Sequence, residues 1–219
     1  MSVLEQLNVT NDTLLGVMRS YPWESREAYG AWMAQHYWTV EATMRMLELA
    51  AGHSRTEEEH AHWFGHLRGE INHHKLFLHD AKRVGVDILK TEPLPLVTAM
   101  VFSVQGGIML RGSHWLLGQA LVLEGMAVNF GAELADRLKV HGKSAFLETH
   151  VEDDLGDDGH YEAGIRYMLA LPPEKQDEAA QAIKVTGYLY AGLIGDLKSG
   201  SGSTSATGTG SFGITVNSR

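Results

Sequence analysis

Helix-breaking residues divide this chain into a few long segments, and that division constrains its fold more than any other feature. Strand signals are nearly absent, because the valines are scattered and no alternating run is bounded by hairpin turns. The positions of Gly, Pro and N-capping residues predict helices over about 11–20, 25–51, 56–84, 93–106, 113–140, 144–169 and 174–198. We therefore expect an all-α fold, a bundle of about seven helices.

The chain is long enough for one domain with a hydrophobic core, at 219 residues. We expect that domain to span residues 1–198. From Ser199 the composition changes to Ser, Gly and Thr, which is typical of a flexible tail over 199–219. The uncharged stretch from Pro93 to Leu110 has the length of a membrane-spanning helix. Its two prolines, its Gly pair and Gln105 favour a buried core helix instead.

Composition excludes several classes of function. The net charge of −9, with no basic patch to offset it, argues against nucleic-acid or anionic-membrane partners. The absence of cysteine rules out disulfides, Cys-ligated zinc, iron–sulfur clusters and a thiol nucleophile. No secretory signal pattern opens the sequence, so we expect a cytoplasmic protein. Twelve histidines are the notable excess.

Two predicted helices each carry histidine and carboxylate residues at the spacing i, i+4, i+7, which places three side chains on one helix face. The two stripes are His66, Glu70 and His73, and His150, Asp154 and Asp157. Imidazole and carboxylate together suit iron or manganese, and facing helices of a bundle can supply four to six ligands. A solvated polar face is the alternative interpretation of each stripe.

Glu124 is the one Asp, Glu, Lys or Arg residue between Arg111 and Glu133, within an otherwise apolar run. Burying a lone carboxylate is costly unless it is paired, protonated or bound to a cation. Metal binding would explain Glu124 together with the two stripes, whereas a neutral, hydrogen-bonded core glutamate is the alternative. Three predicted helices thus each offer an inward carboxylate.

Over roughly residues 28–195 these features resemble the heme-oxygenase-like diiron oxidases and oxygenases, whose fold is shared with thiaminase II and the pyrroloquinoline-quinone synthase. The resemblance lies in the order of the helices and in a glutamate, expected to be buried, about fifty residues after the segment that begins at His73. The motifs are His73 followed by Leu76-Phe77 and Gly85, then Glu124, then His150-xxx-Asp154.

The resemblance implies a set of iron ligands. Four residues stand where the family pattern expects them: His73, Glu124, His150 and Asp154. The pattern is not matched at Asp157, where the family has a histidine, or at His66, where it has a glutamate that Glu70 could replace. Weaker matches are Glu41, His36 and His160. We therefore expect one iron site to have a full set of ligands, and the other to bind iron weakly or only transiently.

The resemblance also implies a non-heme diiron enzyme that uses O2 to oxidise a small molecule. We expect an amino acid or amino-acid-derived substrate in a biosynthetic pathway, with N-oxygenation, C–C cleavage or nitrile formation as the outcome. Arg68 and Arg111 could bind a substrate carboxylate. An external electron donor and a homodimer are compatible with this interpretation. The alternatives are a cofactorless oxidase similar to the quinone synthase and a metal-free helical protein that binds small molecules. Without cysteine, thiaminase II activity is excluded.

Overall fold

A computed structural model describes residues 1–154 and 159–200, with only the backbone described for 151–154. These residues form helices and no strand, so the predicted all-α fold class is confirmed. The α-helices are α1 (Val3–Arg19), α2 (Arg26–Gly52), α3 (Glu57–Gly69), α4 (His73–Val84), α5 (Pro95–Arg111), α6 (Leu117–Leu138), α7 (Ala145–Asp154), α8 (His160–Ala170) and α9 (Pro173–Ser199). Short 3-10 turns precede α5 (Ile88–Lys90) and flank α6 (Ser113–Leu116 and Lys139–His141).

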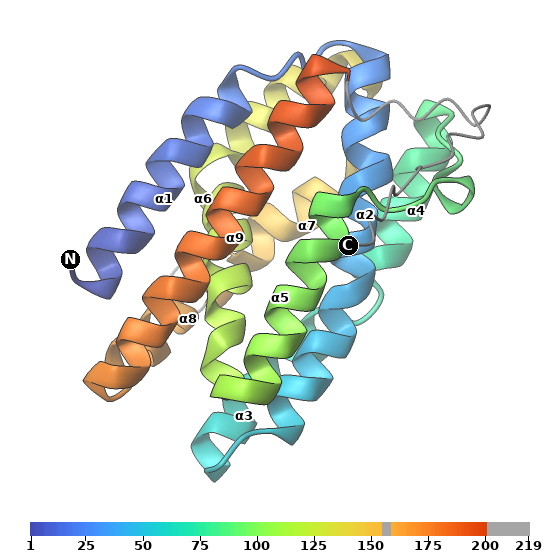
Figure 1. The fold of residues 1–219 in the computed structure, drawn as a ribbon. Helices are drawn as coiled ribbons and strands as arrows, with labels where there is room; N and C mark the ends of the chain where they lie inside the picture. Colours follow the sequence, from blue (N-terminus) through green and yellow to red (C-terminus); the bar gives the residue numbers. More distant parts are fainter. Residues whose placement is uncertain (155–158, 201–219) are drawn as a thin grey trace, which may run out of the picture.

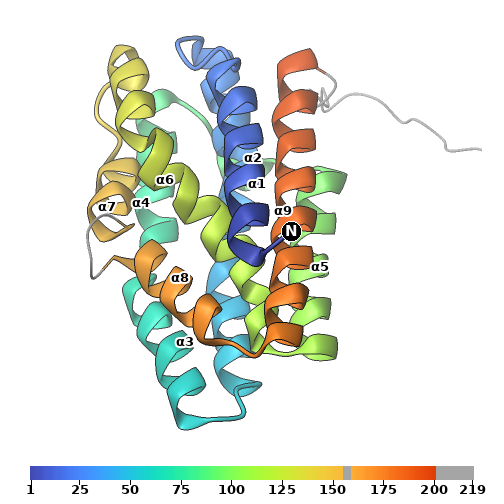
Figure 2. The same cartoon turned by 90° about the vertical axis from the view of Figure 1, so that its left-hand side faces the viewer.

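The long helices lie side by side along one axis, and α9 packs against α1, α5 and α6 (Figure 1). The short helices α3, α4, α7 and α8 gather on the side of the molecule away from α5 and α9 (Figure 2). Helix α6 contacts α7 and α8 as well as α9, so it joins the two sides. Gly118 permits the close packing of α6 on α9, because a Cβ there would overlap the backbone of Ala182.

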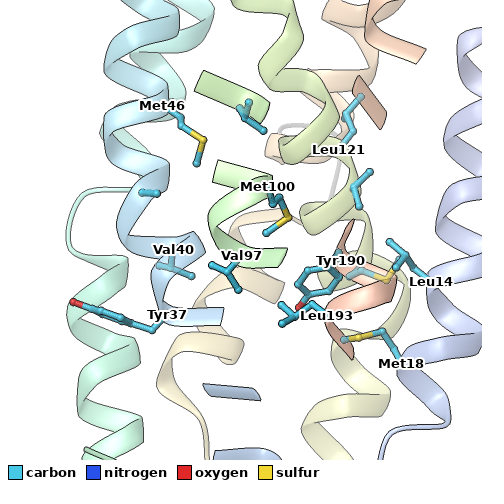
Figure 3. Close-up of a cluster of buried hydrophobic side chains, with 14 of the residues drawn as sticks. Leu14, Met18, Tyr37, Val40, Met46, Val97, Met100, Leu121, Tyr190 and Leu193 are labelled. Atoms are coloured by element: carbon cyan, nitrogen blue, oxygen red, sulfur yellow. The ribbon is translucent and has the colours of Figure 1, made fainter. Parts of the chain in front are cut away.

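The hydrophobic core fixes the long helices to one another (Figure 3). The part of the core labelled in Figure 3 includes Leu14 and Met18 of α1, Val40 and Met46 of α2, Val97 and Met100 of α5, Leu121 of α6, and Tyr190 and Leu193 of α9. Each of these side chains is less than 9% exposed. The core therefore holds α2 and α6 as a stable frame beside the shorter helices.

Two predicted helices are each broken into two. The expected helix over 56–84 ends at Gly69 and restarts at His73, because Asn72 has a left-handed backbone with φ of 77°. Asparagine adopts this conformation more readily than most residues, since its short polar side chain can hydrogen-bond locally. The expected helix over 144–169 is likewise divided into α7 and α8.

Other helix boundaries also differ from the prediction. Helix α1 starts earlier, at Val3, because Ser2 and Glu5 form a capping box. Helix α5 continues past the Gly106-Gly107 pair to Arg111 and buries one face. Within the described part of the chain, no helix combines the length and apolarity needed to cross a membrane. Residues 201–219, most of the predicted tail, lie outside the described ranges.

Candidate metal centre

The break between α3 and α4 places three potential ligands close together. His66 lies in the last turn of α3, Glu70 caps the end of that helix, and His73 begins α4. The left-handed Asn72 redirects the chain between Glu70 and His73. The two histidines therefore approach Glu70 from different helices instead of from one continuous face.

Glu70 lies between two groups of histidines and is only 8% exposed. Its Oε1 atom is 3.8 Å from Nε2 of His66 and 4.0 Å from Nδ1 of His160. Its Oε2 atom is 3.0 Å from Nδ1 of His73. In each of the groups His66–Glu70–His160 and Glu70–His73–His150, the ligand atoms lie within 4.8 Å of one another. The two oxygens of one carboxylate thus face different groups.

Glu124 reaches the first of these groups from α6. Its Oε1 atom is 3.0 Å from Nε2 of His66. Its Oε2 atom is buried and has no hydrogen-bond partner among the described residues. A buried carboxylate oxygen without a partner is costly, and a bound cation would satisfy it. The lone carboxylate noticed in the sequence is therefore placed beside the histidines.

The electrostatics of this cluster favour positive charge. Burial disfavours the imidazolium form of His66, but Glu124 and Glu70 outweigh that effect and raise the pKa of His66 to about 10. Burial would raise the pKa of Glu70, but hydrogen bonds from His66 and His73 and the nearby His150 hold it well below its usual range. Carboxylates kept ionised beside imidazoles form a donor set that fits iron or manganese.

His150 and His160 complete the two groups from separate helices. His160, the first residue of α8, stacks on His66 with 4.5 Å between ring centroids. His150, on α7, packs against His73 at 4.7 Å and against Phe146 at 4.2 Å. The division of the helix predicted over 144–169 into α7 and α8 therefore brings both histidines toward Glu70.

The cluster borders a cavity of about 600 Å³, counting any open solvent that it includes. Part of its lining is polar and comes from the cluster, namely His66, Glu70, Glu124 and His150. The remaining lining is mostly apolar and comes from α2, the Ser113–Leu116 turn and α6: Val40, Leu47, Leu116, Ala120 and Leu123, with His36, Thr39, Thr43 and Gln119. A small molecule in this cavity would therefore lie next to the histidines and carboxylates.

The structure brings six of the predicted ligands together: His66, Glu70, His73, Glu124, His150 and His160. Glu41 is not among them, because it pairs with Arg45 at 2.8 Å on the outside of α2. His36 lines the cavity but belongs to neither group, since it stacks on Trp32 at 4.8 Å. The side chain of Asp154 and all of Asp157 lie outside the described part of the chain.

The two arginines considered for substrate binding lie away from the cavity. Arg68 is exposed on α3. Arg111 is more than half exposed and lies 3.5 Å from the carboxylate of Glu178. Neither residue lines the cavity beside the cluster. The structure therefore does not place these side chains where a carboxylate of a bound molecule would meet them.

The three neutral polar residues of the cavity wall were not predicted from the sequence. Thr39 and Thr43 stand one helical turn apart on α2, and Gln119 interrupts the apolar run that precedes Glu124. A neutral polar residue in an apolar helix segment is the signal that could have identified them. Gly69 was not predicted either, although the absence of a side chain at this position makes room for His160.

The fold has a counterpart among solved structures. A crystal structure of a domain of unknown function from Shewanella denitrificans, described as having a heme oxygenase-like fold, superimposes with a TM-score of 0.75. The match covers 92% of this chain and 94% of that one. The chain has a heme oxygenase-like fold. With 13% sequence identity, the likeness concerns the fold alone. No family model matches the sequence, and no curated protein matches it significantly.

Proposed function

We propose that this heme oxygenase-like protein is a non-heme diiron oxidase or oxygenase that uses O2 to oxidise a small molecule. The observation that supports the proposal most strongly is the position of Glu70, whose two carboxylate oxygens face two different groups of histidines. A carboxylate shared in this way suits a pair of metal ions that lie close together. One group adds His66, His160 and Glu124, and the other adds His73 and His150.

Iron bound to these residues would supply the electrons and the open coordination positions that O2 activation requires. The protein residues hold the ligands in place and control the surroundings. Glu70 and Glu124 provide negative charge that offsets the charge of the metal ions. The apolar lining, including Val40 and Leu123, limits water near the cluster and accepts the apolar part of a substrate.

The substrate, the electron donor and two further ligands belong to the same proposal. The substrate would be an amino acid or amino-acid-derived metabolite of a biosynthetic pathway, and an external donor would supply electrons. Asp154 and Asp157 would add carboxylates to the second group. The fold is compatible with this chemistry but does not select it, because one fold can carry unrelated activities.

Metal content after anaerobic loading with Fe(II) and removal of the excess is the test. We expect about two iron ions per wild-type chain, as two-metal sites require, and substantially less iron in Glu124→Ala. The matched control is His79→Ala, which removes a histidine whose side chain is 73% exposed. It should retain the wild-type iron content and O2 consumption.

Either of two results would favour another function. Turnover that persists in the presence of a chelator would favour a cofactorless oxidase. A wild-type protein that retains no iron, with unchanged stability and ligand binding when metal is added, would favour a metal-free binding protein. Retained activity in Glu124→Ala would contradict the assigned role of that carboxylate.

A further inference from the structure

Two residues that line the cavity beside the cluster each have a buried polar atom that the protein does not satisfy. Oε1 of Gln119 and Oγ1 of Thr39 have no hydrogen-bond partner among the described residues. Gln119 is 2% exposed and Thr39 is fully buried. Both residues line the cavity, one from α6 and the other from α2. Buried polar groups normally have hydrogen-bond partners, so a bound molecule is the natural source of the two missing partners.

The amide of Gln119 is held in one orientation by its neighbours. The hydroxyl of Thr43 donates its hydrogen to the backbone carbonyl of Thr39 at 2.9 Å. The oxygen of that hydroxyl can therefore only accept from Gln119, whose Nε2 lies 3.1 Å away. Reversing the amide would set two acceptors against each other. Oε1 is consequently the atom left over, and it can only accept a hydrogen bond.

The remaining polar atoms match an amide or a hydroxyl better than a carboxylate. Gln119 offers an acceptor, and the hydroxyl of Thr39 can donate or accept. An amide or a hydroxyl on the bound molecule would satisfy both atoms. A carboxylate has no hydrogen to offer to Gln119, and the described lining of the cavity contains no lysine or arginine to balance its charge.

The polar atoms and the cluster lie at different places along α6. Gln119 precedes Glu124 by five residues, which corresponds to a rise of about 7.5 Å along a helix axis. A molecule held by Gln119 therefore presents another part of its structure to the cluster. The lining includes Val40, Leu47 and Leu123, which suit an apolar body.

We propose that Gln119 and Thr39 bind the neutral amide or hydroxyl group of a substrate with an apolar body, and so determine which molecules the cavity accepts. This inference rests on the proposed oxidase function, because it treats the cavity as the substrate site of the cluster. It assigns substrate recognition to uncharged residues instead of to Arg68 and Arg111.

Calorimetric titration with four probes of similar size tests the proposal: hexanamide, methyl hexanoate, hexanoate and hexylamine. Wild-type protein should bind hexanamide about tenfold or more tightly than methyl hexanoate, because the ester cannot donate to Gln119. Gln119→Met should reduce that ratio to near one, and Thr39→Val should weaken the binding of hexanamide. Thr39→Val removes a hydroxyl that makes no described hydrogen bond, so the fold should be retained. The control is Gln105→Met, which changes a glutamine of α5 outside this cavity and should preserve the ratio.

The proposal is overturned if hexanoate or hexylamine binds as tightly as hexanamide, if Gln119→Met retains the wild-type ratio, or if Thr39→Val binds hexanamide as tightly as wild type. Iron content is measured on the same samples, with and without Fe(II) loading. A preference for hexanamide in a protein that retains no iron would support this binding site and contradict the oxidase function. Two bound iron ions without the preference would do the reverse.

Discussion

The imidazole of His160 occupies the space that a side chain at Gly69 would need. A Cβ on Gly69 would lie 2.7 Å from Cε1 and 2.8 Å from Nε2 of that ring. These distances are too short for any real contact, so the glycine at the end of α3 is what allows α8 to bring its histidine close to Glu70. Residues far apart in the sequence are thereby joined in one group of candidate metal ligands.

Gly69→Ala should therefore displace His160 and weaken one of the two groups. We expect iron content after Fe(II) loading to fall from about two ions per chain to about one, while the fold is retained. The control is Gly65→Ala, because a Cβ at that position of α3 meets nothing within 4 Å. That substitution should keep the iron and raise the free energy of unfolding by up to about 1 kcal/mol. Unchanged iron binding in Gly69→Ala would contradict the role of His160.

Glu70 and His150 should differ in how much iron their loss removes. Glu70→Ala takes away the carboxylate that belongs to both groups, so we expect little iron to remain. His150→Ala affects only the group that contains His73, so we expect about half of the iron to remain. Metal analysis of both variants after anaerobic loading measures the difference. Equal losses would show that the carboxylate is not shared.

The buried His36 makes stability depend on pH. Burial, reinforced by the nearby His150, lowers its pKa from 6.5 to about 3. Between these values the unfolded chain binds a proton that the folded protein does not, so the free energy of unfolding falls as the pH is lowered through 6.5 toward 3. One such group contributes a slope of at most about 1.4 kcal/mol per pH unit.

Urea unfolding at pH 7 and at lower pH checks this effect. The loss of stability on acidification should be smaller in His36→Gln than in wild type, because glutamine does not titrate. The exposed His53 provides the control, and His53→Gln should retain the wild-type dependence. A wild-type slope in His36→Gln would mean that other groups cause the change.

The hydroxyl of Tyr190 links two aromatic rings of α2. It accepts a hydrogen bond from Nε1 of Trp32 at 3.0 Å and lies 3.2 Å from Nδ1 of His36, to which it can donate. Tyr190→Phe leaves the buried indole N–H without this partner, so we expect a loss of about 1–3 kcal/mol in the free energy of unfolding. Tyr188 is 78% exposed, and Tyr188→Phe should have almost no effect. Chemical denaturation of both variants provides the comparison.

The sequence predicts much of this fold because several helix ends carry local signals. Ser25 accepts a hydrogen bond from the backbone of Ala28 and starts α2, as expected of an N-cap. Gly85 has a left-handed backbone and ends α4. The break at Asn72 has no comparable signal, because asparagine also occurs within helices and its backbone conformation here depends on tertiary packing.

The candidate site was predicted in part for the wrong reason. His66, Glu70 and His73 were expected to share one face of a continuous helix, whereas the structure joins them across a break between two helices. Their convergence requires the packing of α3 and α4 on α2 and of α4 on α7, which no local pattern contains. Glu124 could be singled out because burying a lone carboxylate is costly in any helix. Gln119 is neutral, so burying its side chain costs less free energy, and it stands out less in the sequence.

The left-handed turn at Asn72 allows one half of the centre to change while the other is retained. His66 lies before the turn on α3, and His73 lies after it on α4. Substitutions that shift α4 therefore move one histidine and leave the other with its partners on α6 and α8. Natural variation can therefore change the candidate ligand of α4 separately from those of α3. A protein engineer can likewise replace His73, the candidate ligand of α4, and keep His66 on α3.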